Sequence, residues 1–99
     1  MLNYADEHRS SRSVPNGGRI LIVEDDPDLR EALCHTLRVA GFEPASARDG
    51  EEALVSLRGA EDIGLVVSDV QMERMDGLAL LHSIKADRPD VPVLLMTAY

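Results

Sequence analysis

Two short apolar runs of this 99-residue chain end in acidic side chains. Residues 20–23 (Ile-Leu-Ile-Val) lead into Glu24, Asp25 and Asp26, and residues 63–68 (Ile-Gly-Leu-Val-Val-Ser) lead into Asp69. If both runs are parallel strands of one sheet, their carboxyl ends lie side by side in the crevice where open α/β sheets bind ligands. Two carboxylates about 4 Å apart repel by about 4 kcal/mol at an effective dielectric constant of about 20. A bound divalent cation is the simplest compensation for this repulsion.

The elements around these acids alternate between apolar runs and amphipathic stretches, which is typical of βα units and a parallel sheet. A weaker strand interrupted by Pro44 is expected at a sheet edge, because proline cannot donate a ladder hydrogen bond. The patterns predict strands at residues 19–23, 43–47, 65–68 and 91–96, and helices at residues 27–39, 50–59 and 77–87.

Acidic residues also mark the starts of the predicted helices. Asp26 stands directly before Pro27, a cap followed by proline at the first helical position. This favours capping over metal ligation for Asp26. Asp49 and Glu52 have the spacing of a capping box, and Asp76 with Gly77 is expected to shape the start of the third helix.

Three βα units and a closing strand, joined by right-handed crossovers, predict an α/β fold with a flavodoxin-like, doubly wound parallel sheet. The expected strand order is 2-1-3-4. The switch point then lies between the first and third strands, and the two acidic strand ends flank it.

Composition excludes several classes of function. The net charge of −8 opposes direct nucleic-acid binding by this segment, and three aromatic residues are too few for a base-stacking platform. No apolar stretch reaches the length of about 20 residues that spans a membrane. The single Cys34 cannot form an internal disulfide, which fits a cytoplasmic protein. Residues 1–17 are polar and end near a Pro-Asn-Gly turn, so we expect a flexible leader.

Three motifs in this order resemble the receiver domain of two-component response regulators. They are the acidic pair Glu24-Asp25, residues 68–72 (Ser-Asp-Val-Gln-Met) with residues 75–77 (Met-Asp-Gly), and residues 96–98 (Met-Thr-Ala). The resemblance covers the chain from about Gly18 to Tyr99.

The resemblance implies a role for each matching residue. Asp69 would be the phosphoacceptor, taking a phosphoryl group from a sensor histidine kinase. Asp25, Asp69 and the backbone carbonyl of Gln71 would hold Mg²⁺, with Glu24 acting through a water molecule or behind the direct ligands. Oxygen ligands with open positions suit Mg²⁺ better than zinc, and Mn²⁺ is a possible substitute. Thr97 would be the switch hydroxyl that hydrogen-bonds a phosphoryl oxygen.

Two departures from the family pattern stand out. Glu73 takes the place of a common proline after Met72. The fifth strand, with a lysine that pairs with the phosphoryl group, and the last two helices are missing, and Lys85 lies on the third helix, where it cannot substitute. We therefore expect residues 18–99 to be a truncated receiver domain that self-associates through the exposed edge of the fourth strand.

The last residues, 89–99, resemble regulators that drive transcription through an AAA+ ATPase domain, so we expect a transcriptional output domain outside this chain. The preferred interpretation is a phosphorylatable signalling module and not an enzyme that acts on a separate substrate. Two alternatives stay open. One is a receiver-like interaction module that works without phosphate. The other is a Mg²⁺-dependent phosphohydrolase, which is less favoured because Gln71 stands where such enzymes carry a second aspartate.

Overall fold

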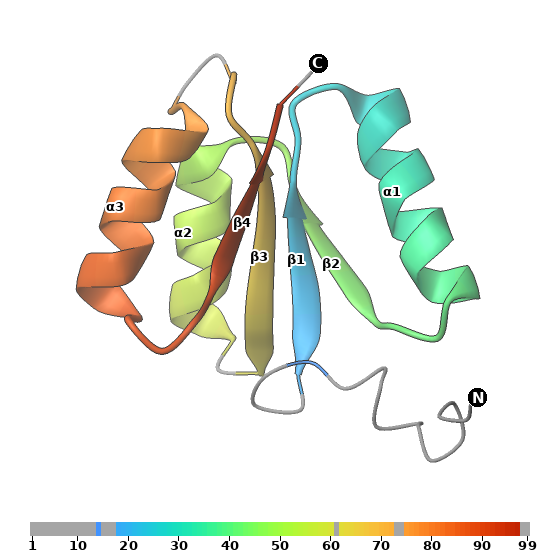
Figure 1. Ribbon diagram of the computed structural model, residues 1–99, viewed down its shortest axis with the longest axis horizontal. Coiled ribbons are helices and arrows are strands. Elements are labelled where there is room, and N and C mark those ends of the chain that lie inside the picture. Colours follow the sequence, from blue (N-terminus) through green and yellow to red (C-terminus); the bar gives the residue numbers. More distant parts are fainter. Residues whose placement is uncertain (1–13, 15–17, 61, 73–74, 98–99) are drawn as a thin grey trace.

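The computed structural model describes residues 14, 18–60, 62–72 and 75–97 of the chain. Within these residues strands and helices alternate as the sequence predicts (Figure 1). The elements are β1 (Arg19–Val23), α1 (Pro27–Val39), β2 (Pro44–Ala47), α2 (Gly50–Gly59), β3 (Ile63–Asp69), α3 (Gly77–Asp87) and β4 (Val93–Met96).

The sheet is parallel throughout, with strand order β2-β1-β3-β4. This confirms the predicted fold class and order, including the edge position of the proline-containing β2. Helices α2 and α3 lie on one face of the sheet and α1 lies on the other (Figure 1). The carboxyl ends of all four strands therefore lie at the same end of the sheet, and those of β1 and β3 are neighbours.

The core has two aliphatic parts, one on each face of the sheet. Alternate residues of β1 serve both, which is why that strand is continuously apolar: Leu21 and Val23 face one part, and Ile20 and Ile22 face the other. The part under α2 and α3 is formed by Leu21, Val23, Ala47, Ala53, Leu57, Ile63, Val66, Leu80, Ile84 and Val91. The part under α1 is formed by Val14, Ile20, Ile22 and Cys34.

Four strand boundaries differ from the prediction by one or two residues. β2 begins at Pro44 instead of Glu43, and β3 ends at Asp69 instead of Ser68. β3 begins at Ile63 instead of Leu65, because Ile63 is fully buried and pairs with Arg19 of β1. β4 begins at Val93 instead of Val91. The N–H of Val91 donates to Arg88 O in a turn (3.1 Å), so this buried residue belongs to the core without belonging to the strand.

The helix boundaries follow the predicted caps. The side chain of Asp26 accepts hydrogen bonds from the N–H groups of Asp28 and Leu29 at the start of α1. Gly41 follows the end of this helix with a φ of 96°, a conformation that favours glycine.

The caps of α2 and α3 are also aspartates. Asp76 accepts from the N–H of Ala79 (2.8 Å), and Asp49 accepts from the N–H of Glu52 (2.8 Å). The return bond at α2 differs from a standard capping box, because the Glu52 carboxylate accepts from the N–H of Arg48, one residue before the cap.

Most of the predicted leader, residues 1–17, lies outside the described residues. Val14 is the exception, and it packs against Ile20, Ile22 and Cys34 with 8% of its surface exposed. Among the described helices, none combines the length and the apolar character that a membrane span requires.

Candidate functional site

The sheet brings three acidic side chains together. Glu24 and Asp25 directly follow β1, and Asp69 is the last residue of the neighbouring β3. One carboxylate oxygen from each lies within 4.8 Å of the others. The predicted convergence of the two acidic strand ends is therefore present. The three differ in burial, since Glu24 is 2% exposed, Asp69 is half-buried and Asp25 is exposed.

Glu24 is the unusual member of this acid cluster (Glu24, Asp25 and Asp69). Its Oε2 accepts a hydrogen bond from the N–H of Asp26 (3.0 Å), whereas its Oε1 is buried and has no partner among the described residues. Burial raises the pKa of Glu24 above its ordinary value of 4.5, and the charges of Asp69 and Asp25 raise it further. A buried acceptor without a partner is costly, so this oxygen fits a site completed by a cation or its water.

The backbone around Glu24 is also held by Arg30. Its Nη1 donates to the carbonyl oxygen of Glu24 at 2.8 Å, which ties the end of β1 to the first turns of α1. Sequence patterns do not identify Arg30, because a contact between a helix side chain and the preceding strand leaves no periodic signal in the sequence.

Asp69 is held in place by hydrogen bonds from its own loop and strand. Its Oδ1 accepts from the N–H of Gln71 at 3.2 Å, and its carbonyl oxygen accepts from the fully buried hydroxyl of Ser68 at 2.9 Å. The N–H of the next residue, Val70, donates to Met96 O of β4 at 2.9 Å. Hydrogen bonds made by Ser68 and Val70 therefore fix the backbone that carries the Asp69 carboxylate.

Gln71 and Thr97 lie at the same edge of the sheet as the acid cluster. Gln71 is exposed, two residues after Asp69. Thr97 is exposed and follows Met96, the residue of β4 that pairs in register with Asp69. The structure thus places both residues near the end of β3, while their roles as ligand and switch hydroxyl stay predictions.

The two ends of the loop from β3 to α3, residues 70–76, lie close together. The N–H of Gly77 donates to Val70 O at 2.8 Å, and a Cβ at Gly77 would lie 2.5 Å from Asp69 O. Only glycine permits this approach, because real Cβ atoms are not found that close to a backbone oxygen. Within this loop, Glu73 lies outside the described residues.

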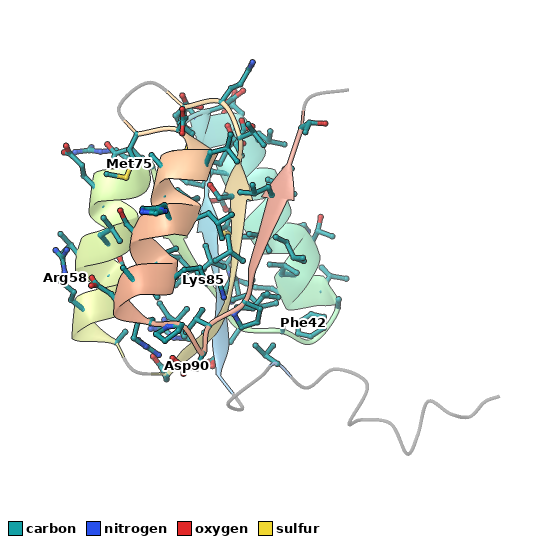
Figure 2. All side chains as sticks on the ribbon, turned by 60° about the vertical axis from the view of Figure 1, so that its left-hand side comes forward. Phe42, Arg58, Met75, Lys85 and Asp90 are labelled. Atoms are coloured by element: carbon teal, nitrogen blue, oxygen red, sulfur yellow. The ribbon has the colours of Figure 1, made fainter. Side chains whose placement is uncertain are left out.

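Lys85 lies away from the acid cluster, as expected for a residue of the third helix. Its Nζ donates to the carbonyl oxygen of Val91 at 2.8 Å, just before β4 begins. This contact is at the amino end of the strand, whereas the acids lie at the carboxyl ends. Figure 2 shows Lys85 on α3, away from the end of that helix where Met75 lies.

A groove of about 610 Å³ lies between α2 and α3. Its lining includes Leu54, Ile84 and Asp90, and it contains no member of the acid cluster. Figure 2 shows two of its lining residues, Arg58 near the end of α2 and Asp90 in the turn after α3, far from the end of the molecule where Met75 lies. The groove is therefore separate from the candidate site.

Comparison with known proteins gives one family. The family model of the response regulator receiver domain matches residues 20–99. The chain is 44% identical over 80 residues to the C4-dicarboxylate transport transcriptional regulatory protein DctD of Rhizobium meliloti, covering 81% of this chain and 17% of that protein. It is 48% identical over 81 residues to the response regulator protein FleR of Pseudomonas aeruginosa, covering 82% of this chain and again 17% of the relative. The chain thus spans about one sixth of the length of these two regulators.

Solved structures agree with the sequence comparison. The response regulator TrrA of Thermotoga maritima, solved with Mg²⁺ and BeF, superposes with a TM-score of 0.78 at 36% identity, covering 83% of this chain and 70% of that one. A second structure, of the T. maritima histidine kinase ThkA in complex with TrrA, matches with a TM-score of 0.77, 36% identity and the same coverage. Together with the parallel sheet and the acid cluster, these matches show that the chain belongs to the receiver domain family of two-component response regulators.

Proposed function

We propose that this chain accepts a phosphoryl group on Asp69 from the phosphohistidine of a sensor histidine kinase, with Mg²⁺ as cofactor. The observation that carries the proposal is the acid cluster, in which Glu24 is buried beside Asp25 and Asp69 with an oxygen that has no hydrogen-bond partner among the described residues. Membership of the receiver family supports the reaction class, and the ThkA–TrrA complex supports a kinase as the partner.

In the proposed reaction the nucleophile is a carboxylate oxygen of Asp69. This oxygen forms a bond to phosphorus while the phosphorus–nitrogen bond of the phosphohistidine breaks, and the imidazole nitrogen keeps the electron pair and takes up a proton. The N–H of Gln71 orients the carboxylate by donating to Oδ1. The half-buried position of Asp69 leaves it open to a donor.

The residues present fit a magnesium site. Asp25, Asp69 and the backbone carbonyl of Gln71 would bind the ion directly, and Glu24 would bind through water. All of these ligands are oxygen atoms, as Mg²⁺ prefers. A bound Mg²⁺ would supply positive charge for the phosphoryl oxygens and the acids. Asp26, in contrast, uses its carboxylate to cap α1.

Thr97 is the proposed switch hydroxyl. Thr97 follows Met96, the residue of β4 that pairs in register with Asp69. Its hydroxyl is therefore at the same end of the strands as Asp69, where it would donate a hydrogen bond to a phosphoryl oxygen. A hydrogen bond of this kind would make the position of Thr97 depend on phosphorylation.

The longer relatives suggest what a phosphorylated receiver would control. DctD is named as a transcriptional regulatory protein and FleR as a response regulator, and both are far longer than this chain. We infer that this receiver acts in the cytoplasm as part of a transcription regulator with a separate output domain. In this role it transmits a signal and does not turn over a substrate of its own.

Self-association through β4 is also proposed. Among the described residues, β4 pairs only with β3, and its Leu94 is 55% exposed. An apolar strand with one unpaired edge favours pairing with another strand. Sedimentation velocity at several concentrations measures whether copies of this chain associate.

The phosphorylation proposal is tested with the purified chain, Mg²⁺ and a small phosphodonor such as acetyl phosphate. Intact mass spectrometry should show one added phosphoryl group, which is lost in Asp69→Asn and Asp69→Ala. Asp26→Ser is the matched control, because it removes a neighbouring carboxylate and keeps a capping oxygen; it should still be labelled. Labelling that persists without Asp69 would disprove the assignment of the phosphoacceptor.

The same experiment separates the two alternatives. A wild-type chain with neither saturable Mg²⁺ binding nor labelling would favour an interaction module that works without phosphate. Steady release of inorganic phosphate from a phosphomonoester would favour a phosphohydrolase.

A further inference from the structure

Arg30, in the first turn of α1, bonds to both chain neighbours of Asp25. Its side chain donates from Nη1 to the carbonyl oxygen of Glu24 (2.8 Å), and its backbone N–H donates to the carbonyl oxygen of Asp26 (2.9 Å). We propose that the side-chain bond makes Arg30 a positioning residue for Asp25 and thereby raises the affinity of the acid cluster for Mg²⁺. The inference rests on the proposed function, because it takes Asp25 as a metal ligand.

The carbonyl group of Glu24 lies just beyond the sheet. β1 ends at Val23, and the N–H of Glu24 still donates to Ala47 O at the end of β2 (3.0 Å). A backbone carbonyl beyond the end of a strand needs a donor from another element when it is not open to water. Figure 1 shows α1 starting close to the end of β1, and the half-buried guanidinium of Arg30 supplies the donor from this helix.

The position of Asp25 depends on this piece of backbone. Its side chain is exposed, so core packing does not hold it, yet one of its carboxylate oxygens lies within 4.8 Å of oxygens of Glu24 and Asp69. The Arg30 bond closes a ring that runs from Glu24 through residues 25–30. Loss of the bond releases the peptide group that joins Glu24 to Asp25. Rotation of this group would move the Asp25 carboxylate relative to Asp69.

The side-chain hydrogen bonds of the two flanking acids act elsewhere in the turn. The Asp26 carboxylate accepts from the N–H groups of Asp28 and Leu29, which both come after Asp25. The Glu24 carboxylate accepts from the N–H of Asp26. Neither of these contacts fixes the Glu24 carbonyl. The cap of α1 can therefore change without releasing Asp25, whereas the Arg30 side chain cannot.

Charge and position predict opposite effects of removing the Arg30 side chain. A guanidinium near a Mg²⁺ site repels the ion, so the loss of its charge alone would strengthen Mg²⁺ binding. Loss of a bond that positions a ligand would weaken Mg²⁺ binding, because groups that orient metal ligands change the affinity by about 10- to 100-fold. The direction of the change therefore identifies the role of Arg30.

Mg²⁺ binding by the 99-residue chain, measured by isothermal titration calorimetry, tests the proposal. Arg30→Met keeps a long helix-forming side chain without charge or donor, and it should weaken Mg²⁺ binding about tenfold. Arg30→Lys keeps a flexible charged donor and should bind within about threefold of wild type. Arg38→Met is the matched control, because it removes the same charge from the exposed last turn of the same helix. Its affinity should equal or slightly exceed that of wild type.

The carbonyl carbon resonance of Glu24, measured by NMR without metal, reports the hydrogen bond itself. It should shift in Arg30→Met and stay in place in Arg38→Met. Unchanged or stronger Mg²⁺ binding by Arg30→Met would overturn the inference. An equal loss of affinity in Arg30→Lys or in Arg38→Met would also overturn it, because the effect would then not come from a donated hydrogen bond at this position.

Loss of folding is monitored by circular dichroism. If Arg30→Met does not fold, Arg30→Gln takes its place with the same expected loss, because its neutral side chain is shorter and its helix propensity is similar. A wild-type chain without a saturable Mg²⁺ site would instead overturn the proposed function. The two failures are therefore distinguishable.

Discussion

At the scale of single residues, Glu24 should lower the stability of the metal-free protein while serving its metal site. Its carboxylate is buried beside two other acids, its Oε1 has no partner in the part of the chain that the structure describes, and burial raises its pKa. Glu24→Gln removes the charge and keeps the shape of the side chain. We expect it to raise the free energy of unfolding at pH 7 without Mg²⁺, because it removes a buried charge that Asp69 and Asp25 repel. The same substitution should weaken Mg²⁺ binding.

The pH dependence of stability follows from the direction of the Glu24 pKa shift. Between the ordinary value of 4.5 and the raised value in the folded state, the folded protein binds more protons than the unfolded chain. The free energy of unfolding contributed by Glu24 therefore falls as pH rises through this window. Urea titrations without Mg²⁺ from pH 4 to pH 8 should show a gain for Glu24→Gln that grows with pH. Glu31→Gln, an exposed acid on α1, is the control and should stay close to wild type. A less stable Glu24→Gln protein at pH 7 would contradict this account.

At the scale of elements, substitutions at the start of α1 distinguish a capping role of Asp26 from a role in metal ligation. Asp26→Ala should cost about 1 kcal/mol of stability, because the N–H groups of Asp28 and Leu29 lose their acceptor. Asp26→Ser should recover most of this loss through its hydroxyl oxygen. Both substitutions remove the same exposed charge, so the difference between them in urea denaturation isolates the cap. Mg²⁺ affinity should stay near wild type in both, and an equal, large loss of affinity would instead identify Asp26 as a ligand.

The helices and strands also show which features of the molecule are determined by the local sequence. The caps Asp26, Asp49 and Asp76 and the strand end at Asp69 were predictable, because capping and the edge at which parallel strands end depend on neighbouring residues and chain order. The convergence of the acid cluster followed from that order.

Contacts that depend on how separate elements pack against one another were not predictable. The hydrogen bond from Arg30 to the Glu24 carbonyl depends on how α1 packs beside the end of β1. The contact of Met75 with Gly50 depends on how the start of α2 packs against the residues before α3. The sequence predicts the start of β4 too early because the apolar run already includes Val91 and Pro92, and apolar residues in a buried turn have the same sequence pattern as those in a strand.

At the scale of the whole molecule, the two faces of the sheet are unequally covered. Of the described helices, α2 and α3 lie on one face, and α1 lies on the other, where it packs against β1 and β2 (Figure 1). Leu94 of β4 pairs in register with Val67, which contacts the α1 side of the core, so both belong to this less covered face. We therefore expect copies of the chain to meet at the apolar surface next to the edge of β4 that pairs with no other described strand.

Leu94→Lys tests this expectation. Burying a leucine contributes about 1.5–3 kcal/mol, so the association constant should fall by about tenfold or more. The chain carries a net charge of −8, and one lysine reduces this repulsion between copies, so dissociation would not be caused by added charge. Val55→Lys on α2 is the control, because it adds the same charge at a residue that is 66% exposed and far from β4 in the sequence. Sedimentation velocity should show Leu94→Lys as more monomeric than wild type and Val55→Lys, whereas equal sedimentation of all three would place the contact elsewhere or show that this chain is monomeric.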